Sequence, residues 1–218
     1  MKVLLLDFNG TLFFDSGFHQ EAWVNVYKEL NHEAKEDPKA EAFFGPRNDV
    51  IIQRMAPWLS KEERQRVSRH KESMYRTMCS LHPEEVHLVP GVEEFLEEAK
   101  RRNIPFILAS ASIKENIDFY FDTFDLGRWF CKEQCVYDDG SYENKGEMHM
   151  EAARRLGVSL SECLIVEDSL TSLKEAKETG AGCIVAIGND NTKEKIMELG
   201  VDHFIYDFTE MNFSWFDD

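Results

Sequence analysis

Residues 3–12 read Val-Leu-Leu-Leu-Asp-Phe-Asn-Gly-Thr-Leu, so a four-residue apolar run ends in a carboxylate and a glycine-bearing turn. A short apolar run closed by a turn signal is typical of a strand buried on both faces of a parallel sheet. Asp7 would then stand at the carboxyl end of that strand, where open α/β sheets bind their ligands. An Asp here can equally be a helix N-cap or a turn residue, so this segment alone leaves both interpretations open.

Four more short apolar runs follow along the chain, and stretches of helical period separate them. Strands that alternate with helices predict parallel βαβ units. Residues 92–99 illustrate the helical period, because their apolar side chains recur at one-turn spacing. We therefore expect an α/β protein with a Rossmann-like parallel sheet core flanked by helices. The four runs are Phe106 to Ala109, Cys163 to Val166, Cys183 to Ile187 and Phe204 to Tyr206.

The segment between residues 15 and 87 has no strand-like run of comparable strength but carries two apolar stripes at helical spacing. It therefore predicts an all-helical cap domain inserted after the first strand. The core domain is then discontinuous and consists of residues 1–14 and 88–218, with boundaries where Gly and Pro cluster. The stripes are Ala22, Trp23, Val26, Tyr27 and Leu30, and Val67, Met74, Met78 and Leu81.

The formal net charge of -16 limits the partners of this chain. A nucleic-acid backbone or an anionic membrane would repel such a surface. Solvated helix faces such as Glu93, Glu94 and Glu97 explain the acidity without any partner. The sequence has no apolar stretch long enough to cross a bilayer and no recognisable secretory leader. We expect a cytoplasmic monomer that acts on a small molecule and binds neither nucleic acid nor membrane.

Polar side chains follow two more of the predicted strands. Ser110 comes after the second strand, and Glu167 with Asp168 comes after the strand that begins at residue 163. Because the carboxyl ends of parallel strands meet at one edge of a sheet, we expect these groups near Asp7. Lys145 precedes a helical stretch that leads into the acidic strand, so it can lie on the same edge. Carboxylates, a hydroxyl and an ammonium in one crevice predict a site for Mg²⁺ and a phosphate group.

Four short motifs in this order resemble those of the haloacid dehalogenase (HAD) superfamily. Within that superfamily, the likeness is closest to the β-phosphoglucomutase-like phosphatases and mutases, which carry a helical cap in the same place. The match spans nearly the whole chain. The motifs are Asp7-Phe8-Asn9-Gly10-Thr11-Leu12, Leu108-Ala109-Ser110-Ala111-Ser112, Lys145-Gly146 and Val166-Glu167-Asp168-Ser169.

The resemblance implies metal-binding and nucleophilic roles. Asp7 would attack phosphorus, form an aspartyl-phosphate and contribute one ligand to Mg²⁺. Glu167 and Asp168 would be further metal ligands, and the backbone carbonyl of Asn9 would complete the protein's share.

The resemblance also implies a phosphate-binding set. Ser110, with its neighbour Ala111, and Lys145 would bind the phosphoryl group and offset the charge that develops on it. Each matched residue also has an ordinary structural explanation. Ser110 and Asp168 can cap helices, and Lys145 can be a solvated residue at a helix start.

Asn9 departs from the family pattern, in which a second Asp protonates the leaving oxygen and later activates water. An amide cannot do this, and general acid–base help is worth about 10²–10⁴ in rate. Four explanations stay open: a substrate whose leaving group needs no proton, a proton supplied by His19 of the predicted cap, decay to a phosphate-ester binding module, or an engineered change from Asp. We rank naturally weakened or specialised catalysis first.

The predicted cap supplies three candidate substrate-binding residues. His19 and Arg47, the latter in Gly45-Pro46-Arg47, resemble cap residues of β-phosphoglucomutase, and Arg76 falls where that family places a basic residue. If they carry over, the substrate has a second anionic or polyhydroxylated end. Trp23 belongs to an apolar stripe and fits a core position instead, and Arg76 can be a solvated helix residue.

Three functions follow from this pattern. The first is a Mg²⁺-dependent phosphatase that acts on a small phosphorylated metabolite through Asp7. The second is a sugar-phosphate mutase, which Asn9 disfavours because the transfer needs proton exchange with two hydroxyls. The third is a binding protein without turnover. A dehalogenase is disfavoured because the acidic pair Glu167 and Asp168 would repel Asp7 without a metal.

Overall fold

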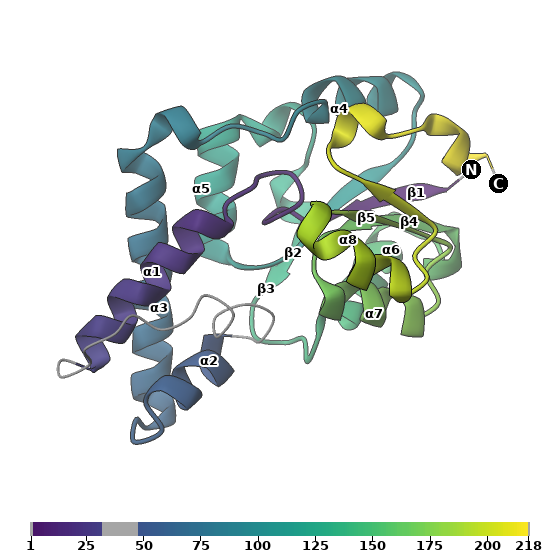
Figure 1. Ribbon diagram of the computed structural model, residues 1–218. Coiled ribbons are helices and arrows are strands. Elements are labelled where there is room, and N and C mark those ends of the chain that lie inside the picture. Colours follow the sequence, from purple (N-terminus) through teal and green to yellow (C-terminus); the bar gives the residue numbers. More distant parts are fainter. Residues whose placement is uncertain (1, 32–47, 218) are drawn as a thin grey trace. The chain divides into compact units, whose positions relative to one another are not determined.

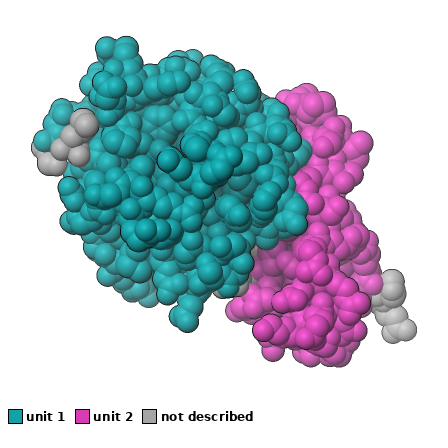
Figure 2. Space-filling model, turned by 180° about the vertical axis from the view of Figure 1, so that it is seen from behind, with its two compact units in different colours: residues 1–14, 87–218 teal, residues 15–86 magenta. Residues whose placement is uncertain are grey.

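The computed structural model describes residues 2–31 and 48–217, and the chain folds into two compact units (Figure 2). Unit 1 combines residues Met1–Phe14 with His87–Asp218, and unit 2 comprises Asp15–Val86. In the described residues unit 2 contains helices and no strand, as the sequence predicts.

Unit 1 is built on a six-stranded sheet in which all neighbouring strands are parallel (Figure 1). The strand order is β3-β2-β1-β4-β5-β6, so β1 lies inside the sheet. This confirms the predicted α/β fold. The strands are β1 Val3–Leu6, β2 Phe106–Ile113, β3 Val136–Asp138, β4 Cys163–Glu167, β5 Cys183–Ile187 and β6 His203–Ile205.

One face of this sheet packs against three helices. Alternate strand residues such as Val3 and Leu5 share a buried cluster with Met148 of α6, Leu173 of α7 and Ile196 of α8. Helix α4 lies on the other side of the sheet (Figure 1). The helices of unit 1 are α4 Val92–Arg101, α5 Lys114–Phe124, α6 Lys145–Leu156, α7 Leu170–Glu178 and α8 Asp190–Glu198.

A tight turn follows β1 and sets the position of the residues after Asp7. The carbonyl of Phe8 accepts the N–H groups of Leu12, at 2.8 Å, and Phe13, at 3.1 Å. Gly10 has φ +71°, a left-handed conformation that strains residues with a Cβ. The Phe8 ring is fully buried, so this turn is part of the core of unit 1.

Unit 2 has its own small core. Trp23 packs with Val26, Ile51 and Ile52, which confirms that Trp23 is a core residue. Ser60 and Glu63 form a capping box at the start of the longest helix. The helices of unit 2 are α1 Ser16–Leu30, α2 Asn48–Met55 and α3 Lys61–Leu81. Within residues 2–31 and 48–217, no helix is both long and apolar enough to span a membrane.

Candidate active site

The candidate site lies in unit 1, where the chain reverses its direction of travel across the sheet. The chain runs from β1 outward to β2 and β3, then returns to the other side of β1 for β4, β5 and β6. Such a reversal leaves a crevice at the carboxyl ends of the strands, where doubly wound folds bind ligands. Asp7 directly follows β1, and Glu167 is the last residue of β4, so these two carboxylates meet at this crevice.

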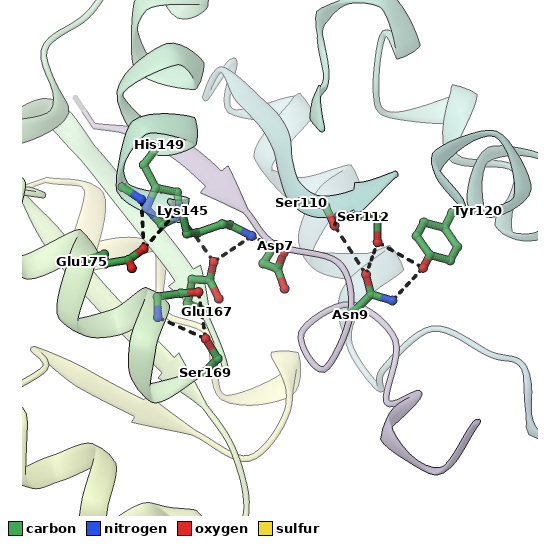
Figure 3. Close-up of polar contacts among 12 residues, drawn as sticks. Asp7, Asn9, Ser110, Ser112, Tyr120, Lys145, His149, Glu167, Ser169 and Glu175 are labelled. Atoms are coloured by element: carbon green, nitrogen blue, oxygen red, sulfur yellow. Dashed lines mark hydrogen bonds and ion pairs between the residues drawn. The ribbon is translucent and has the colours of Figure 1, made fainter. Parts of the chain in front are cut away.

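Helix α6 supplies the cation of the site from its first residue, Lys145. The side chain of Asn144 caps the helix by accepting the N–H of Glu147. The carboxylate of Glu175 in α7 accepts the N–H groups of Lys145, at 2.9 Å, and Gly146, at 3.2 Å (Figure 3). These bonds satisfy donors that have no partner within the helix and hold its first turn against α7.

Four buried ionisable side chains connect the end of β1 with β4 and α6. The Lys145 Nζ donates to Asp7 Oδ1 at 2.5 Å and lies 3.0 Å from Glu167 Oε1 (Figure 3). The Nε2 atom of His149, one helical turn after Lys145, lies 3.3 Å from the same Glu167 oxygen. All four side chains are buried, so water screens these interactions little.

Burial and neighbouring charges shift the pKa values of these groups. Burial, and then the Glu167 carboxylate, raise the pKa of Asp7 to about 7. Burial alone would raise the pKa of Glu167, but Lys145 and His149 hold it below its ordinary value. Burial lowers the pKa of His149, because it disfavours the charged imidazolium. Burial opposes the charge of Lys145, but the carboxylates of Asp7 and Glu167 raise its pKa above the ordinary value.

Asp168 completes a cluster of three carboxylates with Asp7 and Glu167. One oxygen from each lies within 4.8 Å of the others, which is close enough to share a single cation. A Cβ at Gly10 would collide with the Asp168 carboxylate, so the glycine in the turn leaves space for this group. With all three carboxyl groups ionised, the cluster and the Lys145 ammonium carry a net charge of about -2, and the all-oxygen donor set suits Mg²⁺. The residues present therefore fit the predicted metal.

Asn9 belongs to a separate group of polar contacts beside this cluster. Its Nδ2 donates to the Tyr120 hydroxyl at 2.7 Å, and its Oδ1 accepts from the Ser112 hydroxyl at 2.6 Å. Ser110 also donates to Oδ1, at 3.4 Å. Figure 3 shows the Asn9 side chain turned toward Ser112 and Tyr120 and away from Lys145 and Glu167.

The local structure bears on the structural explanations that the sequence offered for three of these residues, whose functional roles stay predictions. Ser110 lies within β2 and does not cap a helix, because α5 begins four residues later. Lys145 is buried and is not a solvated helix start. The cap of α7 is Ser169, which accepts the N–H of Ser172, so Asp168 is not needed for that purpose.

The candidate residues of the predicted cap are only partly described. His19 is held in unit 2, where its Nδ1 lies 2.5 Å from the Nζ of buried Lys71 and its Nε2 lies 3.2 Å from Asp15 Oδ2. Arg76 is a half-buried residue of α3. Arg47 lies outside the described residues. In unit 1, Ala111 is an exposed residue of β2. Substrate-binding roles for these four residues stay predictions.

Sequence reasoning did not single out several residues that shape the site. His149 follows Lys145 by four residues, and Ser112 follows Ser110 by two, so helix and strand periodicity could have indicated both. Tyr120 and Glu175 reach the site from α5 and α7 through tertiary contacts. No local pattern around either residue marks it.

The sequence matches a known protein family. Residues 1–180 match the model of the haloacid dehalogenase-like hydrolases. YhcW of Bacillus subtilis (strain 168), which bears a phosphatase name, is 32% identical over 122 residues, which cover 56% of this chain and 54% of that protein. A haloacid dehalogenase-like hydrolase domain-containing protein of Arabidopsis thaliana is 30% identical over 99 residues, covering 44% of this chain and 31% of that protein. The match therefore spans about half or less of these two relatives.

Solved structures agree with this placement. A family IA, variant 3 HAD hydrolase from Entamoeba histolytica has a TM-score of 0.91 and 27% identity, covering 100% of this chain and 98% of that one. CbbY from Rhodobacter sphaeroides, solved with xylulose-(1,5)bisphosphate, has a TM-score of 0.80 and 20% identity over 97% of this chain and 96% of that one, a likeness of fold alone. With the family model matched over residues 1–180, this chain belongs to the haloacid dehalogenase-like hydrolase family.

Proposed function

We propose that this protein is a Mg²⁺-dependent phosphatase that acts on a small phosphorylated metabolite through an aspartyl-phosphate at Asp7. The observation that carries the proposal is the cluster of Asp7, Glu167 and Asp168, of which the first two are buried and the third is half-buried. One oxygen from each lies within 4.8 Å of the others, and the Lys145 ammonium donates to Asp7. Phosphatase-named YhcW and the bisphosphate bound by CbbY support a phosphorylated substrate.

In the proposed reaction, an Asp7 carboxylate oxygen attacks phosphorus while the bond to the leaving oxygen breaks. That oxygen departs with the bonding electron pair, and water later cleaves the acyl phosphate to release phosphate and restore the carboxylate. Lys145 orients Asp7 and offsets the negative charge beside it. Bound by Asp7, Glu167, Asp168 and the Asn9 carbonyl, Mg²⁺ would supply charge neutralisation for the transferring phosphoryl group.

Asn9 defines which substrates such an enzyme turns over well. Its amide cannot protonate a leaving oxygen, and His149 is buried against Glu167. In the described part of unit 1, the remaining cation beside Asp7 is Lys145, which the two carboxylates hold in its charged form. We therefore expect acyl and aryl phosphates, whose leaving groups depart without a proton, to react faster than alkyl esters.

The test is an Mg²⁺-dependent turnover assay on acetyl phosphate, an aryl phosphate and glucose 6-phosphate. The expected result is turnover of the first two that disappears with chelator and falls by more than about 10³-fold in Asp7→Asn. Turnover that survives Asp7→Asn would contradict the aspartyl-phosphate route. Binding of Mg²⁺ and a phosphate analogue without turnover of any of these compounds would instead support a binding protein.

A further inference from the structure

Unit 1 contains an open cavity of about 520 Å³ whose described lining residues lie outside the candidate active site. It is formed by helix α4 and by the segment after β6, which includes two short 3₁₀ helices, Phe208–Glu210 and Phe213–Phe216. The two parts lie side by side, because the Phe208 N–H donates to the Pro90 carbonyl at 3.0 Å (Figure 1). Small-molecule sites commonly enclose about 300–1,000 Å³, so this cavity is large enough for a ligand.

Aromatic side chains form the walls of this cavity. Phe95 and Phe208 are almost fully buried, and Phe213 is half-buried. The Phe95 ring stacks on Phe213 with centroids 5.0 Å apart and packs against Phe208 with centroids 5.6 Å apart. Met211 adds a fourth apolar group, whose flexible thioether adapts to the surface that it contacts. These walls suit an aromatic ligand, because aromatic rings favour offset-stacked and edge-to-face contacts with one another.

The backbone holds the two walls close together at the start of α4. Gly91 has φ +84°, a left-handed conformation that glycine adopts readily. A Cβ at Gly91 would lie 2.5 Å from the backbone nitrogen of Thr209. A side chain at this position would therefore force the walls apart, so the shape of the cavity is set by the packing of the backbone.

Two carboxylates of α4, Glu94 and Glu98, lie one helical turn apart and also line the cavity. The protein itself neutralises Glu98, whose Oε1 lies 2.6 Å from Arg101 Nη2 and 2.6 Å from Arg102 Nε. The Arg102 guanidinium also lies over the Phe213 ring, 4.3 Å from its centroid. A carboxylate and an aromatic face of this cavity therefore already hold one cation together, in the geometry of a cation–π contact.

Glu94 lacks such a counter-charge among the described residues, in which no basic side chain forms an ion pair with it. Its neighbours on the helix differ, because Glu93 and Glu97 pair with Arg128 at 3.0 Å and 3.5 Å. The Glu94 side chain is exposed, so its carboxylate is accessible from solvent. The cavity therefore presents one unneutralised carboxylate beside aromatic walls.

We propose that this cavity binds a small organic cation in which an aromatic ring system carries an ammonium group. The ring system would lie between the phenylalanine walls, and the ammonium would pair with the Glu94 carboxylate. Charge complementarity selects this occupant. An anionic molecule would be repelled by Glu94 and by the formal net charge of -16, and a neutral molecule would gain nothing from the carboxylate.

The test compares three indole compounds of similar size: tryptamine, the neutral tryptophol and the anionic indole-3-propionate. Each is titrated into ¹⁵N-labelled protein at about 0.15 M salt, which screens weak surface attraction. Saturable shifts should be confined to residues 91–98 and 208–213. Tryptamine should bind about 5-fold more tightly than tryptophol, as one accessible ion pair allows, and the propionate should bind most weakly. Shifts elsewhere, no saturation, or equal affinities would overturn the proposal.

Matched variants separate the Glu94 carboxylate from the acidity of the whole protein. Glu94→Gln keeps the size of the side chain and should lower the affinity for tryptamine to that for tryptophol. Glu93→Gln removes the same charge from a neighbour that already pairs with Arg128, and should change that affinity by less than about 2-fold. Met211→Ala removes an apolar contact only and should weaken all three compounds by a similar factor. Equal losses in Glu94→Gln and Glu93→Gln would reject a specific site.

Binding at this cavity is independent of the proposed phosphatase. Tryptamine should therefore bind equally well in chelator and in the Asp168→Ala variant, which alters the carboxylate cluster. Loss of tryptamine binding in both conditions would place the compound at the metal site and overturn the proposal. A protein that binds tryptamine at residues 91–98 and 208–213 without turning over any phosphate compound would reject the phosphatase alone.

Discussion

Burial opposes the proposed function of Asp7, because it disfavours the charged carboxylate that would attack phosphorus. Burial and Glu167 raise its pKa from 3.8 to about 7, so folding takes up a proton between these two pH values. The metal-free protein is then less stable as the pH rises through this interval. Asp7→Asn should therefore raise the unfolding midpoint in chelator near pH 8, and the gain should shrink toward pH 5. Thermal unfolding across this range measures it, and a pH-independent gain would contradict the assignment.

His149 is expected to act on the metal site through Glu167. Its Nε2 lies 3.3 Å from Glu167 Oε1, and it shares a helix face with Lys145. Groups that orient metal ligands are typically worth about 10–100-fold in affinity. His149→Ala should weaken Mg²⁺ binding by that factor in titration calorimetry. His203→Ala is the matched control, because His203 stacks on Trp215 at the far edge of the sheet. Equal affinities for the two variants would reject this role.

At the scale of elements, the junction of α6 with α7 positions the Lys145 side chain. The Glu175 carboxylate accepts the first two backbone N–H groups of α6. Its charge makes these hydrogen bonds stronger than those to a neutral acceptor. Glu175→Ala should cost about 1–3 kcal/mol in urea unfolding and should lower kcat/KM because Lys145 loses its support. Glu178→Ala, which removes an exposed carboxylate of the same helix, should change neither quantity by a comparable amount. Similar losses in both variants would contradict this role.

The sequence predicted those strands whose own residues form a recognisable apolar run. The apolar runs of β1, β2, β4 and β5 were recognisable because parallel strands are buried on both faces. The three residues of β3, Val136–Asp138, include a Tyr and an Asp and are paired on one side only, so no apolar run marks this edge strand. Strand β6 lies one residue earlier than predicted, and β2 continues through Ile113 because pairing with β3 extends it.

The same distinction applies to the candidate site, where positions set by strand ends were predictable and contacts set by helix packing were not. The carboxylates of Asp7 and Glu167 were predictable because strand ends in a parallel sheet meet at one edge. The contacts of Lys145 with both carboxylates, and of Asn9 with Tyr120, depend on how helices α6 and α5 pack. Helix packing is set by many side chains together, so no motif at either residue could have specified these partners.

In the molecule as a whole, the proposed metal site and the predicted cap belong to different units. The described carboxylate cluster lies entirely in unit 1, while unit 2 holds a network of buried Lys71, buried Glu72 and partly exposed His19 around its own core. Lys71 lies 5.1 Å from the centroid of the Trp23 ring and 2.9 Å from Glu72, so this network joins α1 to α3 within unit 2. Metal binding and the structure of the helical unit should therefore be separable in experiment.

Hydrogen exchange followed by mass spectrometry can test this division. Mg²⁺ alone should slow exchange in peptides that cover the ends of β1 and β4, because binding stabilises the residues that hold the ion. Peptides from α1 and α3 should not change. If unit 2 serves as the predicted cap, adding fluoride and aluminium to mimic a bound phosphoryl group should then slow exchange in α1 and α3 as well. Asp168→Ala should abolish both responses, whereas protection of α1 and α3 by Mg²⁺ alone would contradict the separation.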